Sequence, residues 1–255
     1  GVATTVNGVY EYIITATDLA GKTHSVTRRL RFDTIGPELT VVSPADAYWS
    51  PAATIAFNGV ASDLTAVDKV YYQRTAESVV IAPDIPADPG VEANWTGAGV
   101  GGGWTLVTGK NTWNFSLTEA DEGRQKVWLA AVDTAANPSV PISRLYGVDL
   151  NSPALNSSIP EQNTRVLFGL SGDAADTNAL ADISTIVITQ SKDGAAAETV
   201  PGVTVTLAGD EKSATWSVSG LPRTPGSMAD SVPLTTASDG EYEYVITATD
   251  VSGKT

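Results

Sequence analysis

The feature that most constrains the fold is a 16-residue pattern that occurs three times in this 255-residue chain. Residues 8–23 read GVYEYIITATDLAGKT, and residues 240–255 read GEYEYVITATDVSGKT. A diverged copy, GRQKVWLAAVDTAANP, occupies residues 123–138, so the offsets are 123 − 8 = 115 and 240 − 123 = 117 residues. A repeat period of this length indicates a domain that recurs along the chain.

Each copy alternates with the two-residue period of a β-strand. The positions on one face are Tyr10, Tyr12, Ile14 and Ala16 in the first copy, Val127, Leu129 and Ala131 in the middle copy, and Tyr242, Tyr244, Ile246 and Ala248 in the last. Because successive strand side chains point to opposite faces, we predict that this set is buried and that the intervening set is mixed or exposed. Each strand then ends at an aspartate followed by a short turn.

The last copy carries the resemblance to a known family. The stretch Asp-Gly-x-Tyr-x-Tyr at 239–244, running into Ala-Thr-Asp at 248–250, resembles the F strand of an immunoglobulin fold, with Tyr242 at the corner position; Gln125 departs from it in the middle copy. The junctions DTIGP at 33–37 and DLNSP at 149–153 lie 149 − 33 = 116 residues apart. This pattern is similar to the bacterial Ig-like repeats of large surface adhesins. The resemblance implies an all-β fold of tandem immunoglobulin-like β-sandwich domains.

The repeat also predicts the domain limits. We expect residues 1–32 to be the C-terminal hairpin, strands F and G, of a preceding domain, residues 33–149 to be a complete domain, and residues 150–255 to be a domain without its last strand. Strands are expected at 39–42, 54–60, 69–74, 78–81, 104–107, 112–117, 126–132 and 142–148, and then near 166–170, 185–190, 203–207, 214–218 and 242–249.

Charge and composition limit the classes of partner that the chain can bind. The net charge of −14, from 29 acidic and 15 basic residues, disfavours nucleic acid and anionic membrane surfaces and favours cations. The chain has no cysteine and no apolar run of the roughly 18–20 residues that a membrane helix needs. Its one histidine, His24, is expected in an exposed hairpin turn, and no catalytic arrangement of residues is found. We therefore expect a protein that is not an enzyme.

Aspartates at the expected junctions are the sharpest candidate site. In an immunoglobulin-like sandwich, the segment that leads into the domain, the B–C loop and the F–G loop lie at one end. These positions hold Asp33, Asp63, Asp68, Asp133 and Asn137 in one domain, and Asp149, Asp173, Asp176 and Asp250 in the next. Gathered carboxylates repel each other, and Ca²⁺ prefers six to eight oxygen ligands. Calcium binding is one hypothesis, and similar adhesin repeats use calcium in this way. Ordinary solvated turns are the alternative, since aspartate is common in turns.

Three functions remain open from the sequence. The leading hypothesis is a structural spacer of a secreted, cell-surface repeat protein of the adhesin-stalk type, in contact with neighbouring Ig-like domains of the same chain. A second is a carbohydrate-binding module that uses the insertion at 83–104, with Trp95 and Trp104 stacking on a surface glycan; a protein ligand is a further option. A third is a subunit of an extracellular filament or sheath that self-associates through an open strand edge. The tryptophans Trp113 and Trp216 are expected in the cores instead.

Overall fold

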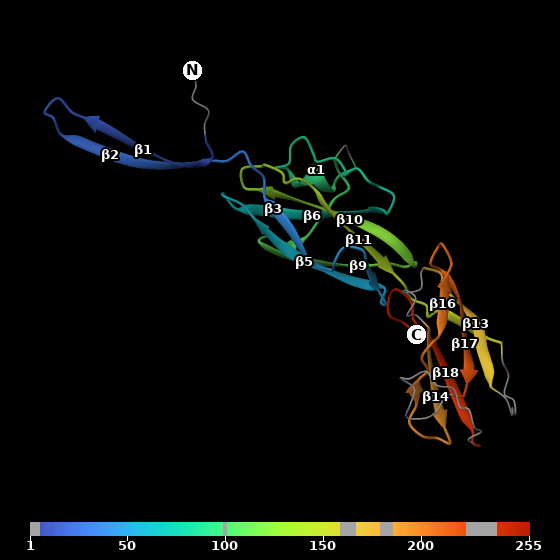
Figure 1. Cartoon of the computed structure of the whole chain (residues 1–255). Coiled ribbons are helices and arrows are strands. Elements are labelled where there is room, and N and C mark those ends of the chain that lie inside the picture. Colours follow the sequence, from blue (N-terminus) through green and yellow to red (C-terminus); the bar gives the residue numbers. More distant parts are fainter. Residues whose placement is uncertain (1–5, 99–100, 159–166, 179–185, 223–238) are drawn as a thin grey trace. The chain divides into compact units, whose positions relative to one another are not determined.

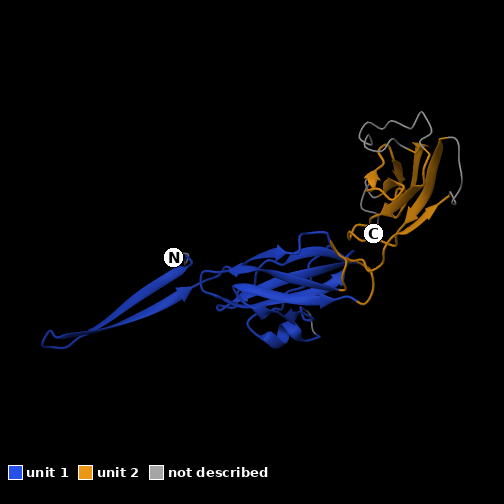
Figure 2. Ribbon diagram, turned by 90° about the horizontal axis from the view of Figure 1, so that it is seen from below, with its two compact units in different colours: residues 1–48, 54–119, 124–147 blue, residues 49–53, 120–123, 148–255 orange. Residues whose placement is uncertain are grey.

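The computed structural model describes residues 6–98, 101–158, 167–178, 186–222 and 239–255 (Figure 1). Apart from the five-residue helix α1 (Glu92–Thr96), every regular element of this part is a β-strand. The protein is therefore all-β, as the sequence predicts. The described chain divides into two compact units: residues 1–48, 54–119 and 124–147 form the first, and residues 49–53, 120–123 and 148–255 form the second (Figure 2).

The chain begins with a hairpin that forms a two-stranded sheet of its own. Strand β1 (Gly8–Thr17) pairs antiparallel with β2 (Thr23–Phe32) over its whole length. The first unit continues with a two-sheet sandwich, in which one sheet has the order β3–β5–β9–β8 and the other the order β4–β11–β10–β6–β7. Its strands are β3 (Glu38–Ser43), β4 (Tyr48–Ser50), β5 (Thr54–Ser62), β6 (Val67–Ala76), β7 (Thr105–Leu106), β8 (Thr108–Gly109), β9 (Thr112–Thr118), β10 (Gly123–Asp133) and β11 (Ile142–Val148).

The second unit repeats this plan. One sheet has the order β12–β13–β17–β16, and the other has the order β15–β14–β18. The strands are β12 (Ala154–Ser157), β13 (Phe168–Ala175), β14 (Ile186–Lys192), β15 (Glu198–Thr199), β16 (Thr204–Leu207), β17 (Ser213–Leu221) and β18 (Tyr242–Ala248). In both sandwiches one sheet has the A–B–E–D order of immunoglobulin domains, as β3–β5–β9–β8 and as β12–β13–β17–β16. The other sheet has C′, C and F side by side, as β7–β6–β10 and as β15–β14–β18, which is the immunoglobulin-like arrangement. The predicted fold class is confirmed.

A glycine–tryptophan pair recurs in the core of each sandwich. Gly59 on β5 lies opposite Trp113 on β9, and Gly172 on β13 lies opposite Trp216 on β17. Both indoles are buried, as predicted from the sequence. A β-carbon at Gly59 would come within 2.2 Å of Trp113 Cζ2, and one at Gly172 within 2.7 Å of Trp216 Cζ2. Each glycine is therefore required because its partner's indole lies flat over the bare backbone.

Strand β10 departs from the predicted one-sided burial. Val127, Leu129 and Ala131 face the sandwich core as expected, but the intervening Trp128, Ala130 and Val132 are buried as well. The insertion after β6 covers this outer face: Trp95 of α1 stacks on Tyr71 with ring centroids 4.4 Å apart, and Trp104 packs edge-on against Trp95 at 5.6 Å. The first unit thus has a second, smaller core that the second unit lacks among its described residues.

Most predicted strands are present within two or three residues of their expected limits, but β13 ends five residues later than expected, and other differences stand out. The strand predicted at 78–81 is wrong, because these residues form a turn and an irregular segment after β6, with Val80 and Ile81 exposed. The strand that pairs with the free side of β6 is instead β7, at the end of the insertion. The short strands β4, β8, β12 and β15 were not predicted. Parts of the strands predicted at 166–170 and 185–190 (residues 166 and 185) lie outside the described residues.

Two further expectations are the absence of a membrane-spanning helix and the exposure of His24. None of the described helices is long and apolar enough to span a membrane. His24 is exposed, as predicted, but it lies in β2 opposite Ala16 and not in the turn itself.

Candidate cation sites

Three aspartates of the first unit meet at one end of its sandwich. Asp33 follows β2 on the segment that leads into β3, Asp63 follows β5, and Asp133 ends β10. One carboxylate oxygen of each lies within 4.8 Å of the others, and we call this group the first cluster. It joins three segments that are far apart in the sequence, which is what the immunoglobulin topology predicted for this end.

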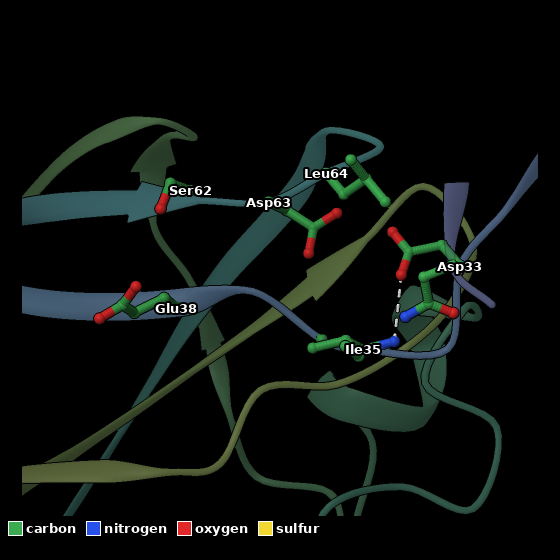
Figure 3. A pocket seen from close by; sticks show the side chains of 8 residues that line it. Asp33, Ile35, Glu38, Ser62, Asp63 and Leu64 are labelled. Carbon is green, nitrogen blue, oxygen red and sulfur yellow. Dashed lines mark hydrogen bonds between the residues drawn. The ribbon is translucent and has the colours of Figure 1, made fainter. Parts of the chain in front are cut away.

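Local turns fix how these carboxylates point. Asp33 Oδ1 accepts a hydrogen bond from the Ile35 amide at 3.1 Å (Figure 3), and Asp63 Oδ1 accepts one from the Thr65 amide at 2.8 Å. Asp133 Oδ1 accepts two, from the amides of Ala135 and Asn137, both at 2.8 Å. Each turn therefore holds its aspartate through Oδ1. Asp33 Oδ2 is buried without a hydrogen-bond partner, which leaves it free to bind a ligand.

The first cluster borders a pocket of about 350 Å³. Its lining includes Asp33, Asp63 and Glu38, together with the exposed apolar side chains of Ile35 and Leu64. Figure 3 shows the carboxylates of Asp33 and Asp63 in this pocket. A small cation with its water shell fits a hollow of this volume and charge.

Three aspartates of the second unit repeat the arrangement. Asp149 precedes β12, Asp176 follows β13, and Asp250 follows β18, and their carboxylate oxygens also lie within 4.8 Å of one another. We call this group the second cluster. Asp149 is fully buried and Asp250 is 1 % exposed. Neither oxygen of Asp149 has a hydrogen-bond partner, and Asp250 Oδ2 has none either.

The second cluster therefore concentrates negative charge around two buried carboxylates, Asp149 and Asp250, with the partly buried Asp176 beside them. Burial, and then repulsion from Asp176 and Asp250, raise the pKa of Asp149 to about 6. The Asn178 amide lies beside Asp149 but does not complete a hydrogen bond to it. Buried carboxylates without partners cost stability unless a proton or a cation neutralises them. A hard divalent cation is the ligand that best fits three converging carboxylates.

The same turn builds the F–G corner of each cluster. Asp133 and Asp250 each accept hydrogen bonds through Oδ1 from the amides two and four residues ahead. Asp18 in the β1–β2 hairpin does the same with Ala20 and Lys22, at 2.8 and 2.9 Å. One chemical rule, aspartate at the first position of the turn, thus holds all three copies of the repeat in one backbone shape.

The residue four positions after the F–G aspartate ties the turn to the segment that leads into the sandwich. In the first unit, Asn137 Nδ2 donates to the backbone oxygen of Asp33 at 3.1 Å and to Asp133 Oδ2 at 2.8 Å. In the second unit, Lys254 Nζ donates to the backbone oxygen of Asp149. Sequence reasoning included Asn137 and missed Lys254, although both lie four residues after the aspartate of the repeat.

Two of the predicted acids lie outside the clusters. Asp68 binds two cations of the protein itself, Lys69 at 2.6 Å and Lys110 at 3.2 Å, and these lysines hold the pKa of Asp68 below its usual value, with hydrogen bonding to Lys69 as the largest cause. Asp173 lies on β13 and accepts a hydrogen bond from Asn156 at 3.0 Å. Asp68 lies five residues after Asp63, and Asp173 lies three residues before Asp176. Sequence spacing alone does not resolve which of two such neighbours joins a cluster.

The structure corrects the hypothesis that Trp95 and Trp104 offer a surface for sugars. Trp95 is fully buried and Trp104 is 2 % exposed. Their indole N–H groups donate to the backbone oxygens of Pro89, at 2.8 Å, and Asp84, at 3.2 Å. A sugar ring needs an exposed aromatic face, and neither indole exposes one. The insertion is a packed cover of its own domain.

Comparisons with known proteins find only distant structural likenesses. No family model matches the chain, and no curated protein matches it. It is similar to a solved tetra-tandem repeat from the extending region of a large adhesion protein, with 17 % identity and a TM-score of 0.35; the match covers 99 % of this chain and 55 % of that one, so the chain spans about half of that structure. It is also similar to fibronectin(III)-like modules of Clostridium thermocellum CbhA (15 % identity, TM-score 0.34, 71 % of this chain and 92 % of that one).

A third similar structure holds the FN1–FN3 domains of chicken CNTN1, with 12 % identity and a TM-score of 0.35, over 96 % of this chain and 71 % of that one. At these values the likeness carries no argument about function. The fold assignment rests on the strand order described above.

Proposed function

We propose that this chain is a structural spacer segment of a secreted, cell-surface repeat protein, built from tandem immunoglobulin-like sandwiches and stiffened by Ca²⁺. The proposed domains are residues 33–149 and 150–255, preceded by the hairpin of another domain at 1–32. The role is mechanical and not enzymatic: stacked sandwiches hold a more distal part of the protein away from the surface. The acidic surface and the strand-rich composition suit such a role.

The observation that supports calcium is the second cluster. Asp149 is fully buried and both of its carboxylate oxygens lack partners, while Asp176 and Asp250 point an oxygen to the same place. A divalent cation would remove the repulsion among the three and satisfy these oxygens. The first cluster has the same geometry with one buried oxygen of Asp33 free.

The position of the clusters links calcium to stiffness. Each cluster contains an aspartate from the segment that leads into its sandwich, Asp33 or Asp149, together with an aspartate from the turn after the F strand, Asp133 or Asp250. An ion bound by both would restrain the backbone of the lead-in segment against the domain that follows it. Spacers need that restraint because a linker that rotates freely shortens the mean reach of the array.

The test is calcium binding with thermal stability as a second readout. Titration calorimetry after EDTA treatment should find two calcium ions per chain, and calcium should raise the melting temperature more than magnesium does. A ligand at 100 times its dissociation constant stabilises a fold by about 2.7 kcal/mol. Absence of binding at millimolar calcium, or equal stabilisation by magnesium, would contradict the proposal.

Matched variants are available for both clusters. Asp149→Asn should abolish one binding event without breaking a hydrogen bond, because neither carboxylate oxygen of Asp149 makes one. Asp173→Asn, on the neighbouring strand and outside the cluster, is its control. Asp33→Asn and Asp68→Asn form the corresponding pair in the first unit, and only the first of them should affect calcium.

A further inference from the structure

The β1–β2 hairpin presents an apolar face that nothing covers in the described structure. Tyr12, Ile14 and Leu30 are 52 %, 63 % and 52 % exposed, and Ile14 lies opposite Val26 across the hairpin. These side chains lie on one face because their positions alternate along β1 and match across the pair. Aliphatic and aromatic groups gathered on one side of a two-stranded sheet indicate a buried partner surface, since a hairpin alone is marginally stable in water.

The same residues are covered elsewhere in this protein. Residues 8–23 and 240–255 agree at 12 of 16 positions, so Tyr12, Ile14 and Ala16 correspond to Tyr244, Ile246 and Ala248 of β18. There, Tyr244 donates its hydroxyl to Gln190 at 3.0 Å and packs edge-on against Phe168, with ring centroids 5.8 Å apart. Ile246 packs against the core of the second sandwich, and Ala248 is 4 % exposed.

We infer that the bare face of the hairpin completes a further domain of the array that resembles the sandwich at residues 150–239, and that β1 takes in that domain the place that β18 occupies here. The pairing of β14 with β18 supplies the register: Ile188 lies opposite Ile246, Gln190 opposite Tyr244, and Ile186 opposite Ala248. In the inferred domain Ile14 therefore lies opposite the counterpart of Ile188, and the Tyr12 hydroxyl reaches the counterpart of Gln190. Strand β2 then extends the sheet beyond β1.

Charge favours the same partner. Residues 1–32 hold four basic side chains (Lys22, Arg28, Arg29 and Arg31) and two acidic ones (Glu11 and Asp18), a net charge of 4 − 2 = +2. Residues 150–239, the sandwich that the partner resembles, hold 4 basic and 10 acidic residues, a net charge of 4 − 10 = −6. A basic hairpin is attracted to an acidic sandwich, whereas two hairpins repel each other.

The consequence concerns the order of domains in the proposed array, on which this inference rests. The hairpin belongs to a sandwich of the second type, so the repeating unit is two unlike domains, with a period of 240 − 8 = 232 residues. A sandwich with the tryptophan-rich insertion then alternates with one without it. The middle copy of the repeat, at 123–138, diverges because its F strand must also bury an outer face beneath that insertion.

The test is a chain in which residues 240–255 are replaced by a second copy of residues 8–32. The hairpin should complete the second sandwich, so the melting transition of the second unit should rise by several degrees relative to the unmodified chain. A variant with the order of the β2 residues scrambled controls for added length. A transition at or below that of the unmodified chain, or loss of the folded second unit, would overturn the inference.

The register is tested by cysteine pairing, since the chain has no cysteine of its own. In the replaced chain, Ile188→Cys together with cysteine at the added copy's position 14 should form an internal disulfide in high yield, because directly opposed strand residues are close enough to be bridged. Cysteine at position 13, on the opposite face, is the matched control. Equal yields would overturn the register, and efficient disulfide dimers of a full chain with Ile14→Cys alone would show that hairpins pair with each other instead.

Both measurements are made in EDTA. They depend on packing and not on a bound ion, so a failure of the calcium proposal would leave them unchanged.

Discussion

The two clusters place the same three aspartates on the same scaffold, yet they differ in what surrounds them. In the first cluster the neutral amide of Asn137 links the F–G turn to Asp33, while Asp33 and Asp63 are only partly buried. In the second cluster the ammonium group of Lys254 makes the equivalent link to Asp149, and Asp149 is fully buried. The first cluster is thus more open and is linked by a neutral amide, whereas the second is more closed and has the ammonium group of Lys254 beside it.

The two sandwiches differ in a second way that bears on stability. The first unit buries both faces of β10, because its insertion adds a layer of tryptophans over the outer face. The second unit exposes Val245 on the corresponding face of β18. The comparison teaches that the repeat conserves the end of the sandwich where the aspartates meet, while its sides are free to vary. The predictions below test how independent these features are.

The largest effect is expected from removing the added layer. Trp95→Ala should destabilise the first unit by about 3–5 kcal/mol, because the indole is fully buried between Tyr71 and Trp104. Calorimetry should show the transition of the first unit shifted down and that of the second unchanged. Val80→Ala, just before the insertion and 81 % exposed, is the control and should have little effect. A shift of both transitions would mean that the units do not unfold independently.

Next come the glycines beneath the core tryptophans, where the two units should respond alike. Gly59→Ala and Gly172→Ala should each cost about 1–3 kcal/mol in their own unit, since the new methyl group would meet both an indole and a backbone oxygen, Thr40 O at 2.1 Å or Asn156 O at 1.9 Å. Denaturant titration measures this cost. Gly209→Ala, where a β-carbon meets nothing within 4 Å, should be nearly neutral. A neutral Gly172→Ala would show that the second sheet shifts to make room.

The raised pKa of Asp149 predicts a pH dependence of the second unit without calcium. The pKa is about 6 in the folded protein and near 3.8 in the unfolded chain, so the folded state binds more protons between these values. Stability of the second unit should therefore rise by about 1–3 kcal/mol as the pH falls from 7 to 4. Melting in EDTA across this range measures it. The Asp149→Asn variant should be more stable than the unmodified protein at pH 7, and its stability should not rise as the pH falls. An equal rise in this variant would mean that another group causes the pH dependence.

The smallest effect concerns the residue that distinguishes the two clusters. Lys254→Asn should strengthen calcium binding at the second cluster by roughly 3- to 10-fold, because it removes a like charge beside the site and keeps a donor for the Asp149 backbone oxygen. The reverse exchange, Asn137→Lys, should weaken the first site by a similar factor. Calorimetric titration of both variants reads the two sites separately. Unchanged affinity in both would show that the ammonium group lies too far from the ion to matter.

Parts of the site could be read from the sequence, and parts could not. The repeated aspartate at the end of each F strand and the aspartate of each junction identified Asp33, Asp133, Asp149 and Asp250 correctly as neighbours within their domains. Choosing between Asp63 and Asp68, or between Asp173 and Asp176, required the structure, because one turn decides which carboxylate points to the end of the sandwich. The order of polar and apolar residues in the sequence does not say which way each carboxylate points.

The hypothesis that Trp95 and Trp104 bind sugars is wrong for a related reason. An insertion rich in glycine and proline indicates a surface loop, which makes ligand binding one hypothesis for the tryptophans within it. The continuous apolar run from Val127 to Val132 was the signal that both faces of β10 are buried, and it predicts a cover of this kind. The other two copies of the repeat alternate between apolar and polar residues. The same one-sided burial is therefore expected of the middle copy, although its own residues do not alternate.

The sequence by itself determined the all-β class, the repeat, the alternation of β1 and β18, and the aspartates that end the F strands, since these depend on local periodicity and turn chemistry. Only the tertiary structure decided which acids converge, that Asp149 is buried without partners, and that the insertion folds back onto its own sheet. Those outcomes depend on contacts between residues about 25 to 100 positions apart, whose geometry is set by packing and not by neighbouring residues.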